Sequence, residues 1–144
     1  MRSLDIRADG HYESAGKALE AGWPWPHFSP AEVACKGSGE LKVVPDFLDI
    51  MEMLRHRYSK PMVVNSWYRS PAYNTKVSNT GTNGPHTTGR AVDIHALGHD
   101  RYWLLRHAID LGFTGIGVGK TFLHLDVNLD DPHLVSNRPA VWVY

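Results

Sequence analysis

The sequence predicts a single α+β domain, and three observations support that fold class. Two long segments place apolar side chains at the helical period, whereas several short apolar runs have the length and composition of strands. A length of 144 residues is common for one domain and allows a buried core to form without disulfides. A disulfide framework is excluded in any case, because Cys35 is the single cysteine.

Composition excludes several classes of partner. Fifteen basic and fifteen acidic side chains cancel, so no strong field favours nucleic acid or an anionic membrane surface. No apolar run approaches the roughly 20 residues that span a bilayer, and the first residues lack the apolar core of a signal peptide. We therefore expect no nucleic-acid partner, no membrane partner, and synthesis in a cytoplasm without a signal peptide.

The N-terminal part of the chain predicts short elements. Residues 3–7 alternate in polarity and permit a small edge strand, and residues 12–21 favour a helix. Residues 23–28 alternate tryptophan and proline, which favours an extended strap packed across the domain. Residues 29–35 open with a capping box, Ser-Pro-Ala-Glu, whose proline suits the first position of a short helix.

The central part alternates helices with strands. Residues 45–58 form the clearest predicted helix, and residues 62–66 read as a buried strand. A polar turn is expected at residues 68–74, where a strand ends and functional residues are often found. After a loop at residues 78–85, a short strand at residues 91–94 places Asp93 on a rigid element.

A second helix and three further strands complete the prediction. Residues 100–111 form a helix whose core stripe includes Trp103. Residues 115–118 and 122–127 are expected to pair as a hairpin, and residues 140–144 form a last strand or anchoring segment.

Side chains alternate along the predicted strand at residues 122–127. His124 and Asp126 share one face, and the other face carries Leu123, Leu125 and Val127. We expect the three apolar side chains to enter the core, which leaves His124 and Asp126 together in a polar site on the opposite face.

Two histidines and one aspartate are candidate zinc ligands. His86 and Asp93 flank a short segment that contains Gly89, a residue that permits a tight turn, and His124 follows on a later strand. Two imidazoles and a carboxylate are the ligand types of a catalytic zinc site that keeps one position open for water. Spacing alone is weak support, since the chain holds nine histidines, but the neighbouring carboxylate of Asp126 favours a ligand role for His124.

Two further residues are candidates for the chemistry around the metal. Metal-assisted hydrolysis needs a proton acceptor near the bound water. It also needs a cation that pairs with the oxyanion formed during attack or with the terminal carboxylate of the substrate. Asp126 is the best candidate base, with the alternative that it orients a ligand histidine. Arg69 is the best candidate anion clamp, with the alternative that it closes a surface turn.

Taken together, these residues resemble those of a known family. It is similar to the zinc D-alanyl-D-alanine carboxypeptidases and L-alanyl-D-glutamate endopeptidases of peptidoglycan, which share their fold with the Hedgehog signalling domain, and within them to the short single-domain branch found in phages and prophages. The matching pieces, in order along the chain, are residues 27–32, the helix at 45–58, residues 66–74, 86–93, 115–118, 122–127 and 138–144.

The resemblance implies a small antiparallel sheet with flanking helices and a zinc cleft on its exposed face. It implies that His86, Asp93 and His124 bind Zn²⁺. It also implies that Arg69, with its neighbours Tyr68 and Ser70, contacts the substrate. We expect residues 1–26 to form an N-terminal extension packed on a zinc peptidase domain of residues 27–144.

Three positions depart from the family pattern. Thr121 stands where many members carry an acidic general base, which leaves Asp126 as the candidate. Trp67 replaces the usual glycine before the Tyr-Arg pair and is expected to narrow the cleft. Gly84 replaces a frequent serine and is expected to remove one polar contact.

The sequence therefore predicts a zinc peptidase that cleaves the peptidoglycan stem peptide next to a D-amino acid. The expected setting is a phage or prophage, where the enzyme acts on the cell wall after release or as part of a particle with other virion proteins. The alternative is a weakly active or inactive homologue that serves as a structural or wall-binding component of a virion or tail.

Overall fold

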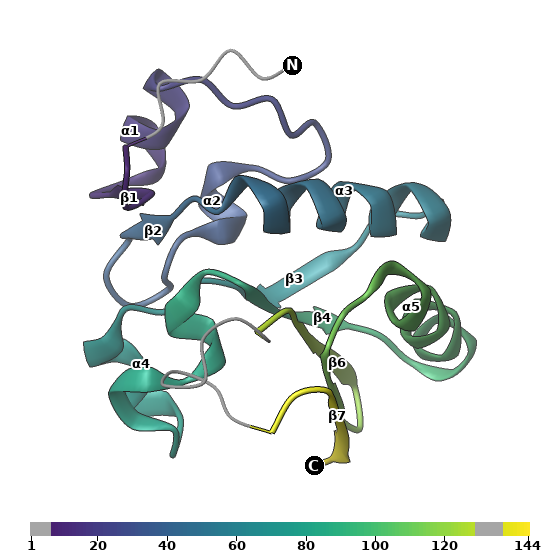
Figure 1. Ribbon diagram of the computed structural model, residues 1–144. Helices are drawn as coiled ribbons and strands as arrows, with labels where there is room; N and C mark the ends of the chain where they lie inside the picture. The colour runs from purple at the N-terminus through teal and green to yellow at the C-terminus, as the bar shows by residue number, and fades with distance from the viewer. Residues whose placement is uncertain (1–6, 129–136) are drawn as a thin grey trace.

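The computed structural model describes residues 7–128 and 137–144, with helices packed against one face of a five-stranded sheet (Figure 1). The elements in chain order are β1 (His11–Tyr12), α1 (Ala15–Glu20), α2 (Pro30–Val33), β2 (Leu41–Lys42), α3 (Pro45–Tyr58), β3 (Val63–Ser66), α4 (Pro71–Val77), the 3₁₀ helices η1 (Gly81–Asn83) and η2 (Pro85–Thr88), β4 (Ala91–His95), α5 (Gly98–Leu111), β5 (Gly115–Val118), β6 (Phe122–Asp126) and β7 (Ala140–Val143). Apart from Arg7, the strand predicted at residues 3–7 lies outside the described residues.

The main sheet has the strand order β3-β4-β6-β5-β7, and a separate ribbon pairs β1 with β2. The first four strands pair antiparallel, as expected for an α+β fold with a small antiparallel sheet. The predicted hairpin of β5 and β6 is confirmed. The last strand, β7, joins the edge parallel to β5.

One face of this sheet enters the core. Leu123 and Leu125 on β6 are fully buried, as the alternation predicts, and belong to the same apolar cluster as Met51 of α3 and Leu104 of α5. Val127 packs against this cluster from just beyond β6. The helices α3 and α5 therefore cover the apolar face, and the opposite face is left for polar side chains.

That opposite face holds the candidate ligands. Asp93 on β4 pairs directly with His124 on β6, and His124 pairs with Gly117 on β5. Asp126 lies on the same face of β6, opposite Gly115. Two glycines on β5 thus lie beside the two polar residues of β6.

The N-terminal strap packs as predicted. Trp25 and Phe28 are buried, and the Trp25 indole donates to Asp49 of α3 at 2.9 Å. Tyr12 and Ala18 lie in the same buried cluster as the rest of the core. The boundary drawn at residues 26 and 27 stays a prediction.

Several elements differ from the predictions. The helix predicted from residue 12 begins only at Ala15, because Ser14 caps it by accepting from the Lys17 backbone N–H. The strand predicted as buried, β3, is instead an edge strand, with Val63 60% exposed. Trp103 is 45% exposed on α5, whose buried residues are Leu104 and Ala108.

A helix also replaces part of the polar turn predicted at residues 68–74. Ser70 accepts from the Tyr73 backbone N–H, and Pro71 takes the first position of α4. This is the same Ser-Pro start that marks α2. Across the described residues, none of the helices has the length and apolar character needed to cross a bilayer.

Candidate metal centre

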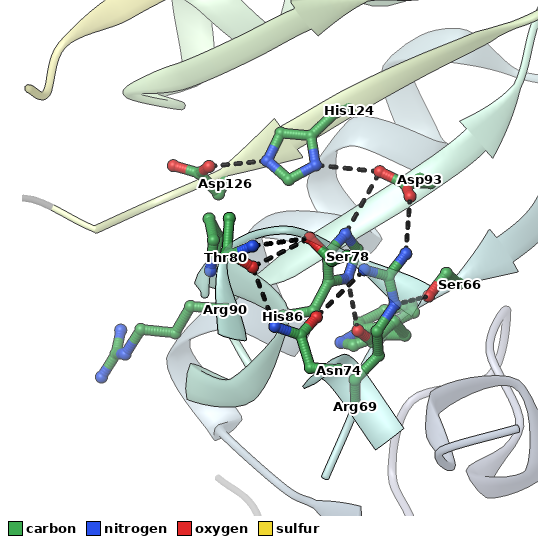
Figure 2. Close-up of polar contacts among 12 residues, drawn as sticks. Ser66, Arg69, Asn74, Ser78, Thr80, His86, Arg90, Asp93, His124 and Asp126 are labelled. Atoms are coloured by element: carbon green, nitrogen blue, oxygen red, sulfur yellow. Dashed lines mark hydrogen bonds and ion pairs between the residues drawn. The ribbon is translucent and has the colours of Figure 1, made fainter. Parts of the chain in front are cut away.

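The three predicted ligands converge on the polar face of the sheet (Figure 2). One possible donor atom from each of His86, Asp93 and His124 lies within 4.8 Å of the others. His86 Nε2 is 3.3 Å and His124 Nδ1 is 2.9 Å from the same oxygen, Oδ1 of Asp93. Both imidazoles are almost fully buried, so the group is preformed rather than assembled from mobile surface side chains.

Two adjacent strands and a tight turn deliver these side chains. Asp93 and His124 are fixed by the direct pairing of β4 with β6. His86 comes from η2, which ends at Thr88 and is capped by Gly89 with a positive φ of 76°. A side chain at Gly89 would be strained by that φ and would come within 3.0 Å of Val44, so glycine suits this turn, as predicted.

Hydrogen bonds to the far nitrogens decide which nitrogen of each ring can bind a metal. His86 Nδ1 lies 2.6 Å from the carbonyl oxygen of Trp67, which can only accept, so Nδ1 carries the proton and Nε2 keeps its lone pair. His124 Nε2 lies 2.7 Å from Oδ2 of Asp126, so Nε2 donates and Nδ1 keeps its lone pair. Both free lone pairs face Asp93.

This donor set fits a zinc ion. Tetrahedral ligands with bonds of about 2.0–2.1 Å lie about 3.3 Å apart, close to the two separations from Asp93 Oδ1. Two lone pairs and a carboxylate oxygen at such distances repel each other unless a cation or proton lies between them. Each imidazole also donates its other N–H to an acceptor, the arrangement that fixes ligand histidines in zinc proteins.

Electrostatics within the group favour a bound cation. Burial lowers the pKa of His86 and outweighs the opposing effect of Asp93. Burial would raise the pKa of Asp93, but the neighbouring imidazoles of His124 and His86 hold it well below its ordinary range. Burial would lower the pKa of His124, but the carboxylates of Asp126 and Asp93 raise it. Asp93 therefore stays ionised beside the two imidazole nitrogens.

The structure places Asp126 behind His124 rather than in the open cleft. Its carboxylate is fully buried and receives two hydrogen bonds from Arg138, each 2.8 Å, besides the one from His124. Burial would raise the pKa of Asp126, but these donors lower it. Of the two roles weighed for this residue, the geometry matches the orientation of a ligand histidine, whereas the assignment as base stays a prediction.

Arg69 lies beside the other oxygen of Asp93. Its Nη2 is 3.5 Å from Asp93 Oδ2, its Nε donates to Ser66, and its Nη1 donates to Asn74. These described partners use three of the five N–H donors of a guanidinium. Arg69 also lines the cleft, so its position allows contact with a bound substrate.

Tyr68 and Ser70 are not brought to the cleft, although a substrate contact was predicted for both. Tyr68 is 6% exposed within the apolar core, and burial raises the pKa of its phenol. Ser70 is 7% exposed and caps α4, and its backbone N–H lies 3.4 Å from the sulfur of Cys35. Both side chains take part in packing or helix capping, and their contact with a substrate stays a prediction.

The structure shows the surroundings of the three residues that depart from the family pattern. Trp67 is 1% exposed between Phe28 and Phe47, so it fills the core and does not narrow the cleft. Gly84 has no room for a serine, because an added Cβ would lie 2.1 Å from Oγ1 of Thr80. Thr121 is exposed next to β6, where its carbonyl accepts from Ala96.

A cleft of about 440 Å³ opens in front of the three candidate ligands. One wall is polar and comes from the end of α4 and the residues after it, including Ser78, Asn79 and Thr80. The other wall is aromatic and comes from β6 and the C-terminal segment, with Phe122, Trp142 and Tyr144.

Three of the residues at this cleft, Arg138, Trp142 and Tyr144, were not predicted as site residues. All lie in the C-terminal segment, and their place depends on the parallel pairing of β7 with β5. The alternation of Val141, Trp142, Val143 and Tyr144 was the available signal, since it puts both aromatic residues on one face of a strand.

Comparisons with known proteins agree with this geometry. A sequence model of the family described as peptidase M15 matches residues 26–126, which include the three candidate ligands and Arg69. No curated protein and no solved structure matches the chain. Peptidases of this family are typically zinc-dependent, in keeping with the His-Asp-His group. Because the match covers most of the chain, this protein belongs to the peptidase M15 family.

Proposed function

We propose that this protein is a zinc peptidase that hydrolyses amide bonds in the peptidoglycan stem peptide, next to a D-amino acid. The observation that carries the proposal is the convergence of His86 Nε2 and His124 Nδ1 on Asp93 Oδ1, with the far nitrogen of each ring already hydrogen-bonded. Membership of the peptidase M15 family supports the metallopeptidase part of this assignment. The substrate part rests on the sequence motifs shared with peptidoglycan peptidases.

His86, Asp93 and His124 would hold the ion and leave its open side towards the cleft. When bound, zinc lowers the pKa of a coordinated water towards neutrality and polarises a carbonyl group. The roles of the surrounding side chains follow from their contacts.

Arg69 would bind the substrate anion. Ser66 and Asn74 hold its guanidinium in place, and Asp93 lies on its inner side. A planar guanidinium with donors left over suits the terminal carboxylate of a stem peptide or the oxyanion formed during attack. We expect Arg69→Lys to lower kcat/KM by about 10- to 100-fold, because a lysine cannot keep the same contacts while binding two oxygens.

A second candidate function is favoured by the lining of the cleft. Hydrolysis needs a proton acceptor near the attacking water. Among the described residues that line the cleft, Asp93 is the only one with a carboxylate side chain, and Asp126 is enclosed behind His124. This arrangement also suits a protein that keeps the fold and the metal without turnover, as a structural or wall-binding component of a virion or tail.

Digestion of purified cell-wall sacculi separates the two functions. The zinc-loaded protein is incubated with sacculi, and released peptides and new amino termini are identified by mass spectrometry. The peptidase proposal expects peptide release that ceases in His124→Ala and in metal-stripped protein. Stoichiometric zinc binding with no released peptide, together with retention of the protein on sacculi, would instead establish the binding function.

The proposed setting is a phage or prophage, in which the protein reaches the wall after release from the cytoplasm or within a particle. Fractionation of induced lysates with an antibody to the protein tests this: the protein should separate with free lysis enzymes or with virions and their other proteins. Recovery only from uninfected cells that carry no prophage would contradict the proposal.

A further inference from the structure

Arg138 and Asp126 form a buried pair on the far side of His124 from Asp93. The guanidinium donates from Nε to Oδ1 and from Nη2 to Oδ2 of Asp126, each at 2.8 Å, so both carboxylate oxygens are held at once. The Arg138 side chain is 9% exposed and that of Asp126 is fully buried. A bidentate pair of this kind fixes the plane of the carboxylate as well as its position.

The same carboxylate fixes the His124 ring. Asp126 Oδ2 accepts from His124 Nε2 at 2.7 Å, which leaves Nδ1 facing Asp93 Oδ1. The hydrogen bonds therefore run in series from Arg138 through Asp126 to His124. A carboxylate buried without its cation is strongly unfavourable, so Asp126 depends on Arg138 for a stable charged state in this position.

The neighbouring strand leaves space for this pair. A Cβ added at Gly115 on β5 would lie 2.1 Å from Oδ1 of Asp126 and 2.4 Å from Nε of Arg138. A Cβ at Gly117 would lie 2.6 Å from Nε1 of Trp142. The guanidinium of Arg138 in turn lies over the Trp142 ring, 4.8 Å from its centroid. The pair thus occupies a site that the backbone of β5 leaves open.

We infer that Arg138 is a positioning residue for the metal centre: it holds Asp126 in place as the acceptor for His124 Nε2, and so keeps His124 Nδ1 directed at the ion. Arg138 lies beyond residues 26–126, so the family match does not include it. The inference rests on the proposed metal-binding role of His124, but its primary readout is metal affinity rather than hydrolysis.

Replacement of Arg138 tests the inference. Arg138→Met removes both hydrogen bonds but keeps an apolar chain over Trp142. Arg138→Lys keeps the charge but cannot hold both oxygens with one planar group. Arg90→Met is the matched control, because the Arg90 side chain points away from the cluster in Figure 2. Zinc affinity is measured by competition with a chromophoric chelator, ligand geometry by the visible spectrum of the Co²⁺-loaded protein, and folding by thermal unfolding without metal.

We expect Arg138→Met to bind zinc about 10- to 100-fold more weakly than the wild type, with an altered Co²⁺ spectrum, as for other residues that orient ligand histidines. Arg138→Lys should fall between it and the wild type, and Arg90→Met should match the wild type. A folded Arg138→Met protein with zinc affinity within about twofold of the wild type and an unchanged Co²⁺ spectrum would overturn the inference. If Arg138→Met shows no cooperative unfolding transition, the same comparison with Arg138→Lys decides.

Failure of this inference can be told apart from failure of the proposed function. Wild-type protein that binds zinc but releases nothing from sacculi would contradict the peptidase proposal and leave the affinity comparison intact. Wild-type protein that binds no zinc would overturn both. Normal zinc affinity in Arg138→Met, beside an active wild type, would overturn the role of Arg138 alone.

Discussion

His86 and His124 face the same carboxylate oxygen, but they are held by different kinds of groups. His86 lies on a 3₁₀ turn and donates to a backbone carbonyl, that of Trp67 in the apolar core. His124 lies on a central strand and donates to the side chain of Asp126, which Arg138 holds. No side-chain substitution removes a backbone carbonyl, whereas a single one removes a carboxylate. The two sides of the metal centre should therefore respond differently to mutation.

The largest effect should come from the ligands themselves, where the two sides are alike. His86→Ala, Asp93→Ala and His124→Ala each remove one of three protein donors, so zinc affinity should fall by more than about 100-fold, beyond the loss for an orienting residue. Competition with a chelator and metal analysis after gel filtration measure it. Stoichiometric zinc at wild-type affinity in any of the three variants would rule that residue out as a ligand.

The second effect should distinguish the two sides through their glycines. Gly115→Ala places a Cβ against Asp126 and Arg138, both buried and fixed, so zinc affinity should fall by about 10-fold. Gly84→Ala, on the side of His86, places its Cβ 2.1 Å from Oγ1 of Thr80 and 2.8 Å from Nδ2 of the buried Asn74, so both side chains must shift. The described side-chain hydrogen bonds of Thr80 and Asn74 run to each other, Arg69, Ser78 and Gly81 rather than to a candidate ligand. We expect a loss of less than about threefold there. Equal losses in the two variants would contradict the comparison.

The third effect should separate stability from metal binding. Trp67→Phe trims a side chain packed against Phe28 and Phe47 but leaves the carbonyl that accepts from His86. The free energy of unfolding of the metal-free protein should fall by about 1–3 kcal/mol, as for other truncations of a buried ring. Zinc affinity should stay within about twofold. Denaturant titration measures the stability, and chelator competition on the same preparation measures the zinc affinity. A large drop in the zinc affinity of a folded variant would contradict the view that the Trp67 backbone carbonyl alone orients His86.

The smallest effect should come from an ion pair remote from both sides. Lys60 and Asp100 form an exposed bridge at 2.6 Å, and the hydrogen bond from Lys60 lowers the pKa of Asp100. A carboxyl whose pKa is lower in the folded state stabilises the protein at neutral pH, and that contribution is lost as the pH falls below about 4. Asp100→Asn should lower the melting temperature by about 2 °C or less at pH 7, and by a smaller amount as the pH falls below about 4.

Zinc affinity gives the control for this last variant, since it should equal that of the wild type. A loss of zinc affinity in Asp100→Asn would show that α5 is coupled to the metal centre, and would contradict the expectation that this ion pair acts on stability alone.

The convergence of the three candidate ligands could be predicted from the sequence because each lies within a short pattern. Strand alternation was enough to place His124 on the face of β6 that faces away from Leu123 and Leu125, and a glycine marked the turn beside His86. The Arg138–Asp126 pair could not be predicted in this way. It depends on a parallel pairing between β5 and β7, and nothing local in the sequence specifies which strand a terminal segment will join.

Other errors have a similar cause. The Ser-Pro start of α2 was recognised, but the same start at Ser70 and Pro71 was taken as a turn, because the polar residues around it suggested a loop. Apolar content suggested that β3 is buried, yet a strand becomes an edge through its neighbours in the sheet, and Val63 is exposed for that reason. Period and composition describe an element, whereas burial depends on what packs against it.

The position of Tyr144 has a practical consequence for handling the protein. Its ring lines the cleft, and its backbone N–H bonds to Val118 just beyond the end of β7. An affinity tag joined after Tyr144 would start at a residue that lines the cleft, and a polyhistidine tag would bring extra imidazoles close to the candidate metal centre. Metal titrations and wall-digestion assays should therefore use protein purified without a C-terminal tag.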